Sequence, residues 1–318
     1  MKKQAILGSI QALRGLGAIA VVIYHALSLH PFFNFRAGAA GVDLFFVISG
    51  AVMFLSIRPE TSALSFLWRR AIRVIPIYWI FTTLAVIYFH TRYPEVTFSK
   101  EHIIRSYLFA PPPEGFVMPV LYPGWTLNYE VFFYLILGAS LLFRSASICI
   151  SICIIAVLGS VFSSNPALGS LYYANQVILE FAAGLMLGWV IKSGYRPEKT
   201  TGAILLTTSI AIFAIHNEFK PEGVIAWGIP SVMMVMGAMA FESSTVIQNR
   251  MVQLLGSASY SIYLIHALAI WGIDWVWPDE RGILTVITAI IISITAGTAV
   301  YLWVENPLLR VMMKIKPK

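Results

Sequence analysis

Apolar residues form long runs along the whole chain, and short polar stretches separate one run from the next. Runs of this length can cross a bilayer as helices. The pattern predicts an all-α polytopic membrane protein with about ten transmembrane helices. The predicted spans cover residues 8–29, 39–57, 74–90, 125–143, 147–163, 176–191, 202–215, 223–240, 258–274 and 283–304.

The breaks between the spans contain turn-forming and charged residues, such as RPE at 58–60 and GYRPEK at 194–199. The longest break, 91–124, contains APPPEG, and its prolines predict irregular structure rather than a further helix. No soluble domain is evident at either end. We therefore expect residues 1–318 to form a single transmembrane domain with no appended soluble domain.

Composition agrees with a membrane protein and indicates its orientation. Hydrophobic residues make up 58% of the 318 residues and charged residues only 12%, whereas a soluble domain carries about a quarter charged residues. An even number of spans places both termini on one side. If that side is the cytoplasm, fifteen of the 22 Lys and Arg residues lie there, six lie opposite and Arg14 lies within the first span, as the positive-inside rule predicts. The net charge of +7 then reflects basic loops that meet anionic lipid, and no nucleic-acid partner is expected.

Two ionisable residues lie inside the first predicted span. Arg14 and His25 are eleven residues apart, so they share one helix face and are separated by about 16 Å along the helix axis. An arginine at the bilayer centre costs roughly 2.5–3.5 kcal/mol, so such residues point to a functional role. Their common face is expected to line a cavity that crosses the membrane.

Two carboxylates are predicted near the depth of His25. Asp43 lies about one turn into the second span, and Glu130 lies about a turn and a half into the fourth. A carboxylate that accepts one ring N–H of a histidine raises the basicity of the other nitrogen. We therefore expect His25, Asp43 and Glu130 to form a catalytic group. A polar cluster that only holds the helices together is the alternative.

Arginines also gather at the cytoplasmic start of the third span. Arg69, Arg70 and Arg73 lie close together in the sequence, and Arg70 and Arg73 share a helix face. Such a cluster is consistent with a topology signal alone. Arginine also binds phosphate in a bidentate manner, so together with Arg14 these side chains predict an anion-binding mouth.

Further polar and aromatic residues lie on the predicted inner faces. Ser259, Tyr263 and His266 follow the spacing i, i+4, i+7, which suits either a packing stripe or substrate contacts. Trp125 and Tyr129 could present ring faces to an acceptor. No metal-ligand spacing is evident, so no metal cofactor is expected.

Five segments together resemble the acyltransferase-3 family of membrane acyltransferases, in particular its branch that acetylates exopolysaccharides. These segments are LRGLGAIAVVIYH, GAAGVDLFFVISGAVM, RRAIRVIPIYW, GWTLNYEVFFY and GSASYSIYLIH, and the resemblance extends over essentially the whole chain. It implies ten transmembrane helices and O-acyl transfer, commonly of acetyl from acetyl-CoA, to a carbohydrate hydroxyl. It also implies that Arg14 and His25 are essential, that the pair Arg70 and Arg73 matters, and that the protein lies in the bacterial inner membrane.

The resemblance leads to a concrete hypothesis. Arg14, Arg69, Arg70 and Arg73 bind the phosphates of acyl-CoA. His25, oriented by Asp43, deprotonates a hydroxyl of an extracytoplasmic or lipid-linked carbohydrate held by Trp125, Tyr129, Tyr263 and His266. A two-step route through an acyl-enzyme on Ser49 or His25 remains open.

Two other classes of protein remain to be distinguished. In a transporter or flippase of lipid-linked sugars, charged helix-lining residues would serve a permeation path, but no inverted repeat is visible. A structural scaffold would not explain Arg14. Bond exchange between labelled acetyl-CoA and a glycan separates the enzyme from both.

Overall fold

The computed structural model describes residues 7–30, 34–96, 98–164, 172–219, 223–278 and 282–315, and these ranges contain helices, turns and loops but no strand. The two shortest α-helices are α4 (Lys100–Tyr107) and α12 (Asn306–Met312). The other α-helices are α1 (Gly8–Ala26), α2 (Gly41–Ser56), α3 (Ala63–Arg92), α5 (Gly124–Ser140), α6 (Ser147–Ala156), α7 (Leu179–Lys192), α8 (Lys199–Phe219), α9 (Val224–Met239), α10 (Arg250–Val276) and α11 (Ile283–Val300).

Seven helical stretches within the described ranges are long and apolar enough to cross a membrane. The chain is therefore an all-helical integral membrane protein. One of the seven stretches, Gly124–Phe162, contains both α5 and α6, while α7 and α9 are shorter than the others. The ten predicted spans each overlap one of these helices, but the number that cross the bilayer stays a prediction.

Several predicted boundaries differ from the observed ones. The third helix begins at Ala63 rather than 74, because the Ser62 hydroxyl accepts a hydrogen bond from the amide of Ser65 and caps the helix. The ninth predicted span begins at Arg250 rather than 258, with Asn249 as its cap. In both cases hydropathy located only the apolar part of a longer helix. The predicted breaks at 163–166, 220–223 and 277–282, and the basic residues Lys2, Lys3, Lys220, Arg281, Lys316 and Lys318, lie wholly or partly outside the described residues.

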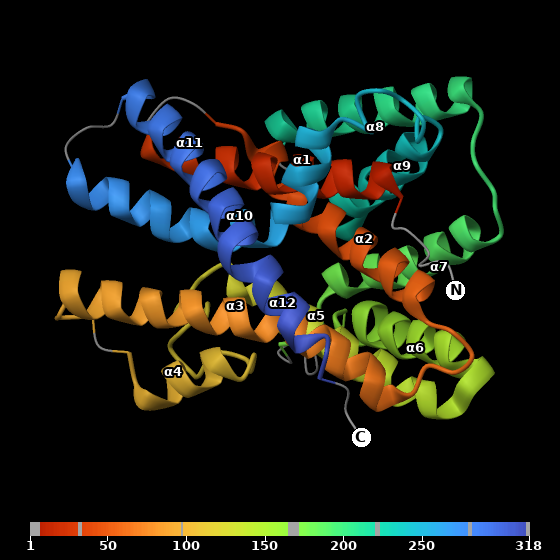
Figure 1. Ribbon diagram of the computed structural model, residues 1–318, viewed down its shortest axis with the longest axis horizontal. Coiled ribbons are helices and arrows are strands. Elements are labelled where there is room, and N and C mark those ends of the chain that lie inside the picture. The colour runs from red at the N-terminus through yellow and green to blue at the C-terminus, as the bar shows by residue number, and fades with distance from the viewer. Residues whose placement is uncertain are drawn as a thin grey trace.

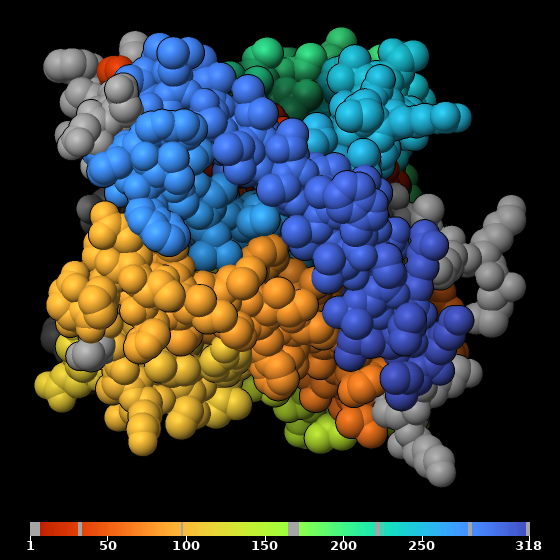
Figure 2. Space-filling view, turned by 60° about the vertical axis from the view of Figure 1, so that its left-hand side comes forward, coloured from red at the N-terminus to blue at the C-terminus, as the bar shows by residue number. Residues whose placement is uncertain are grey.

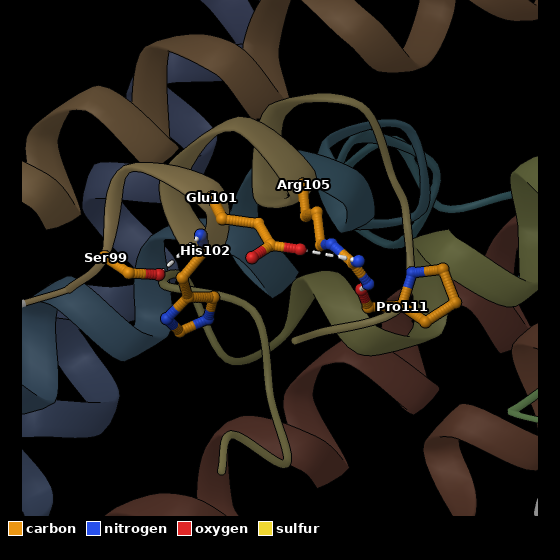
Figure 3. A network of polar contacts seen from close by, with 5 residues as sticks. All are labelled: Ser99, Glu101, His102, Arg105 and Pro111. Carbon is orange, nitrogen blue, oxygen red and sulfur yellow. Dashed lines mark hydrogen bonds and ion pairs between the residues drawn. The ribbon is translucent and has the colours of Figure 1, made fainter. Parts of the chain in front are cut away.

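The loop 91–124 was predicted to be irregular, and this prediction was wrong for α4. The Ser99 hydroxyl caps the helix by accepting from the His102 amide at 3.0 Å (Figure 3). Glu101 and Arg105 form an ion pair of 2.6 Å one turn apart, and Arg105 also donates to the carbonyl of Pro111 at 3.2 Å. The prolines of APPPEG begin at Pro111, after the helix has ended at Tyr107, so they do not prevent it.

Close helix contacts determine the packing around α1, which lies against α2, α9, α10 and α11. A Cβ atom at Gly256 on α10 would overlap the carbonyl of Gln11 on α1, and one at Gly184 on α7 would overlap the carbonyl of Val47 on α2. Small residues that let backbones approach are typical of membrane helix contacts. The first contact brings α10 against α1, and the second brings α7 against α2.

In Figure 1, α8 and α9 lie toward one edge of the view and α3 and α4 toward the opposite edge, while α11 and α12 run diagonally across the molecule. The largest buried cluster joins α3, α5, α7 and α10 and includes Phe66, Tyr78, Leu137 and Phe181. Figure 2 shows the C-terminal segment lying over the beginning of α3, where the Trp68 indole donates to the carbonyl of Ile315 at 3.0 Å. This packing leaves polar cavities between α1, α2, α3, α5 and α10.

Candidate active site

The first of two polar cavities lies among five helices, and we call it the arginine cavity. It has a volume of about 100 Å³. Its charged and hydroxyl-bearing lining residues are Arg14 from α1, Ser49 from α2, Arg70 and Arg73 from α3, Thr126, Glu130 and Tyr134 from α5, and Ser259, Tyr260 and Tyr263 from α10. Three guanidinium groups and a single carboxylate make its lining positively charged.

Two arginines of this cavity donate hydrogen bonds to neutral partners. Arg14 donates to the side-chain oxygen of Gln11 at 3.1 Å, and Arg70 donates to the Ser56 hydroxyl at 2.8 Å. Over the described residues, the one ion pair within 4 Å is in α4 and involves none of these arginines. The buried Nε of Arg70 and hydroxyl of Ser259 also lack hydrogen-bond partners. Buried donors without partners are costly, so the cavity is suited to an anionic ligand.

Glu130 belongs to the arginine cavity and not to the surroundings of His25. One of its oxygens accepts hydrogen bonds from Ser49 at 2.9 Å and from Tyr134 at 2.5 Å. Arg14, Arg70 and Glu130 interact electrostatically. The expected grouping of Glu130 with His25 is therefore corrected, because residue counting gives the depth of a side chain but not its direction.

The second cavity, which we call the histidine cleft, lies beside the C-terminal end of α1, whereas Arg14 lies in the N-terminal half of this helix. It measures about 280 Å³ and is lined by His25, Ser28, Leu29, Tyr122, Ile270, Trp271 and Asp274. These residues come from α1 and the turn after it, from the loop before α5 and from α10. The cleft contains one carboxylate, and none of its described lining residues is Lys or Arg.

A backbone carbonyl orients His25. Its Nδ1 lies 3.0 Å from the carbonyl oxygen of Val21, one turn earlier in α1. Because a carbonyl oxygen only accepts, Nδ1 carries the hydrogen and Nε2 keeps a free lone pair. The neutral ring therefore has the tautomer that a general base at Nε2 requires.

Asp43 does not take the expected position beside this ring. Its carboxyl group interacts electrostatically with that of Glu180, at the start of α7. The face of α2 that carries Asp43 is turned toward α7, and the carbonyl of Val21 occupies the position at His25 that was expected for Asp43. The prediction that the Asp43 carboxylate accepts a hydrogen bond from the His25 ring was therefore wrong.

His266 connects the two cavities. Its ring centroid lies 5.0 Å from that of His25 and 5.6 Å from that of Tyr263, which lines the arginine cavity. Its Nδ1 donates to the Tyr263 carbonyl, so Nε2 accepts a hydrogen bond of 2.9 Å from the Tyr122 hydroxyl. Burial raises the pKa of Tyr122 well above its ordinary value, so this hydroxyl stays protonated.

The cavities share no described lining residue. The single central cavity expected from the sequence is therefore divided in two, with Tyr263 and His266 between the parts. Arg14 lies in one part and His25 in the other, so the spacing of about 16 Å along α1 corresponds to the separation of the two cavities.

Three other predicted site residues lie away from both cavities. Arg69 is exposed, and its guanidinium contacts the Ser65 hydroxyl at 3.2 Å. Trp125 and Tyr129 pack against Phe46, with centroid distances of 6.4 and 6.5 Å. Their rings are part of the core and do not line either cavity.

The sequence interpretation missed Tyr122, Trp271 and Asp274. A signal for Asp274 was present, because it continues the helix face of α10 that carries Ser259, Tyr263 and His266. Tyr122 lies in a loop and Trp271 lies off that face, so periodicity carries no signal for either. Within the described ranges, no group of three or more His, Cys, Asp or Glu residues is placed to hold a metal ion.

Comparison with known proteins agrees with this geometry. The acyltransferase-3 model, which describes an acyltransferase domain, matches residues 7–303. The exopolysaccharide production protein ExoZ of Rhizobium meliloti is 33% identical over 87% of this chain and 91% of its own length. Acyltransferase MdmB of Streptomyces mycarofaciens is 22% identical over 98% of this chain and 94% of its own length. No solved structure matches the chain. The match over nearly the full length shows that this integral membrane protein belongs to the acyltransferase-3 family.

Proposed function

We propose that this protein transfers an acyl group, in particular acetyl, from acyl-CoA in the arginine cavity to a carbohydrate hydroxyl in the histidine cleft. The observation that carries the proposal is the contact between His25 and His266, because it joins two cavities of different chemistry at one imidazole. One cavity is lined by three arginines, and the other contains a histidine with a free Nε2. The relatives named as an acyltransferase and an exopolysaccharide production protein support both halves of the reaction.

The assignment of the acyl donor to the arginine cavity depends on the charge and the size of coenzyme A. Coenzyme A combines a phosphate-rich head with a slender arm that ends in the thioester. The volume of about 100 Å³ has room for the thioester end of such an arm but not for a nucleotide. We therefore assign the thioester end to the arginine cavity and the phosphates to its rim, where Arg70 and Arg73 are the bidentate donors.

The chemical step is direct transfer with His25 as general base. The acceptor oxygen attacks the thioester carbonyl while its proton passes to Nε2 of His25, the C–S bond breaks, and the coenzyme A thiolate takes up that proton from the imidazolium, which restores the neutral ring. The hydrogen bond from His25 Nδ1–H to the Val21 carbonyl stabilises the imidazolium that forms. Transfer requires Tyr263 or His266 to move, because they separate the two cavities.

Direct transfer is favoured over an acyl-enzyme on Ser49. The Ser49 hydroxyl donates to a carboxylate that also accepts from Tyr134 and interacts electrostatically with two arginines. No histidine is among the described lining residues of the arginine cavity, so Ser49 lacks the adjacent imidazole that commonly activates a serine nucleophile. If the route is direct, rapid acid quenching during turnover traps no acylated protein.

We further propose ten spans, with both termini in the cytoplasm of a bacterium and the protein in its inner membrane. The fifteen-to-six distribution of basic residues supports this orientation. It places the arginine cavity toward the cytoplasmic supply of acyl-CoA and the histidine cleft toward the outer face. Reporter fusions at the C-terminus and in the loop after α3 should report opposite sides.

The deciding experiment uses purified full-length protein in proteoliposomes with [¹⁴C]acetyl-CoA and a panel of glycans. We expect acceptor-dependent movement of label from coenzyme A to glycan, abolished by His25→Ala. His90→Ala is the matched control, because His90 is exposed at the end of α3 and should leave transfer unchanged. Vectorial movement of glycan without bond exchange would instead support a transporter, and full transfer by His25→Ala would remove His25 from the chemistry.

A further inference from the structure

The histidine cleft contains an aromatic ring that is held in place from behind. The Trp271 indole stacks on Tyr88 with a centroid distance of 5.6 Å and an interplanar angle of 16°. Phe89 meets it edge-on at 4.9 Å, and the Tyr88 hydroxyl donates to the Trp271 carbonyl at 3.0 Å. Since both the ring and its backbone are constrained, Trp271 presents a preformed apolar surface to the cleft.

Asp274 lies three residues later on α10 and lines the same cleft. A carboxylate is a hydrogen-bond acceptor for hydroxyl groups. The cleft also contains the Ser28 and Tyr122 hydroxyls but, over its described lining, no Lys or Arg. This lining disfavours an anionic ligand and suits a neutral one that is rich in hydroxyl groups.

The two cavities thus differ in the charge of the ligand that they select. The arginine cavity has three guanidinium groups, whereas the only charged side chain among the described residues of the histidine cleft, apart from its histidine, is the carboxylate of Asp274. A flat aromatic surface beside a hydroxyl-binding carboxylate matches a pyranose ring, which has an apolar face and an equatorial rim of hydroxyls. Pockets that combine an aromatic wall with a few polar groups orient their ligands in this way.

We propose that Trp271 and Asp274 form the acceptor subsite, in which one neutral sugar ring stacks on the Trp271 indole and donates a hydroxyl hydrogen bond to Asp274. This inference rests on the proposed function, since it assumes that the ring carries the hydroxyl presented to His25. Trp271 sets the plane of the sugar, and Asp274 selects which hydroxyl lies toward the imidazole. Both are specificity-determining residues of the acceptor, and neither acts on the donor.

The first test measures binding without chemistry. Purified full-length protein in nanodiscs is titrated with methyl β-D-glucopyranoside, methyl β-D-galactopyranoside and methyl α-D-mannopyranoside while tryptophan fluorescence is recorded. We expect a saturable change with at least one glycoside that is lost in Trp271→Phe and shifted at least tenfold in midpoint by Asp274→Asn. Trp277→Phe is the matched control, because Trp277 is exposed at the end of the same helix and does not line the cleft.

The second test measures transfer. Trp271→Ala and Asp274→Asn should raise KM for the glycoside at least tenfold and leave KM for acetyl-CoA unchanged. A cationic ligand such as choline is the alternative that aromatic rings beside a carboxylate admit. A saturable response to choline but to none of the glycosides, or no response to any glycoside, would overturn the proposal.

The failure of this inference is distinguishable from that of the proposed function. If His25→Ala abolishes transfer but Trp271→Ala and Asp274→Asn leave acceptor KM and the fluorescence midpoint unchanged, the subsite is wrong and the acyltransferase mechanism stands. If glycosides bind as expected but His25→Ala still transfers acetyl, the subsite stands and the role of His25 is wrong.

Discussion

The imidazole rings of His25 and His266 lie next to each other, with centroids 5.0 Å apart and planes inclined by 42°. Their hydrogen bonds place the hydrogen of each ring on Nδ1, where a backbone carbonyl accepts it. The two Nε2 atoms differ. That of His266 accepts a hydrogen bond from the Tyr122 hydroxyl, whereas that of His25 has no hydrogen-bond partner among the described residues. His25 is thus the ring available as a base, and His266 supports its position.

This relationship predicts the effect of Tyr122→Phe. Removing the hydroxyl leaves the buried Nε2 of His266 without its donor, which costs about 1–3 kcal/mol. We expect kcat to fall about tenfold or more, with KM for acetyl-CoA unchanged and the pH dependence of kcat altered, since His266 positions the base. Steady-state kinetics from pH 6 to 9 provide the measurement. A uniform loss of activity at every pH, matched by loss of folded protein, would mean that Tyr122 is only structural.

Two adjacent arginines of α3 are predicted to differ in their effect on the KM for acetyl-CoA. Arg70→Ala removes a guanidinium that lines the arginine cavity, whereas Arg69→Ala removes an exposed one. A hydrogen bond to a charged group contributes about 1.5–3 kcal/mol, so we expect KM for acetyl-CoA to rise about tenfold or more in Arg70→Ala. Arg69→Ala should stay within about twofold of the wild type, as is typical of surface changes. Equal effects of the two substitutions on donor KM would contradict the cavity assignment.

Two helix glycines, one in the contact between α2 and α7 and one in α10, predict opposite effects of substitution by alanine. A methyl group at Gly184 meets the Val47 carbonyl, so Gly184→Ala should destabilise the protein by about 1–3 kcal/mol. Gly272, inside α10, has no atom within 4 Å of an added Cβ, so Gly272→Ala should stabilise the helix by up to about 1 kcal/mol. Thermal unfolding in detergent measures both, with Tm lowered in the first variant and unchanged or raised in the second. An unchanged Tm in Gly184→Ala would show that α2 and α7 accommodate the added methyl group without loss of stability.

His102, in the loop between α3 and α5, predicts a pH dependence. Its Nε2–H donates to the Met118 carbonyl at 2.9 Å, and its buried Nδ1 has no partner. Burial lowers the pKa of His102 below its ordinary value of 6.5. Below pH 6.5 the unfolded loop therefore binds more protons than the folded loop, and the stability of the loop falls as the pH is lowered.

Limited proteolysis of the segment 98–120 at pH 7.5 and 5.0 measures this effect. We expect faster cleavage at pH 5.0 in the wild type. In His102→Gln the difference should be smaller, because an amide can donate to Met118 but does not titrate in this range. The same acceleration in both proteins would assign the pH dependence to another group.

The sequence was sufficient for the class of protein, for the approximate position of most helices and for several residues that line the cavities. Eleven-residue spacing placed Arg14 and His25 on one face, and both line cavities as that face requires. Charge clustering likewise identified Arg70 and Arg73. That these residues line cavities could be expected from the sequence, because a shared helix face follows from periodicity within one helix. Their roles stay predictions.

Relations between helices could not be predicted in the same way. Asp43 and His25 lie on different helices, and their contact depends on how each helix is rotated about its axis. That rotation follows from contacts such as Gly184 against Val47, which involve residues more than a hundred positions apart. Trp125 and Tyr129 illustrate the same point, since their rings could have turned toward a cavity but pack on Phe46.

The partition formed by Tyr263 and His266 has a consequence for the fate of the activated donor. A thioester is readily lost to hydrolysis when water reaches it from a wide solvent channel. Because the two cavities are separated at rest, hydrolysis of the thioester is limited to the periods when the side chain of Tyr263 or His266 moves. If the two cavities open toward opposite faces of the membrane, as proposed above, the same layer also prevents small solutes from leaking through the protein.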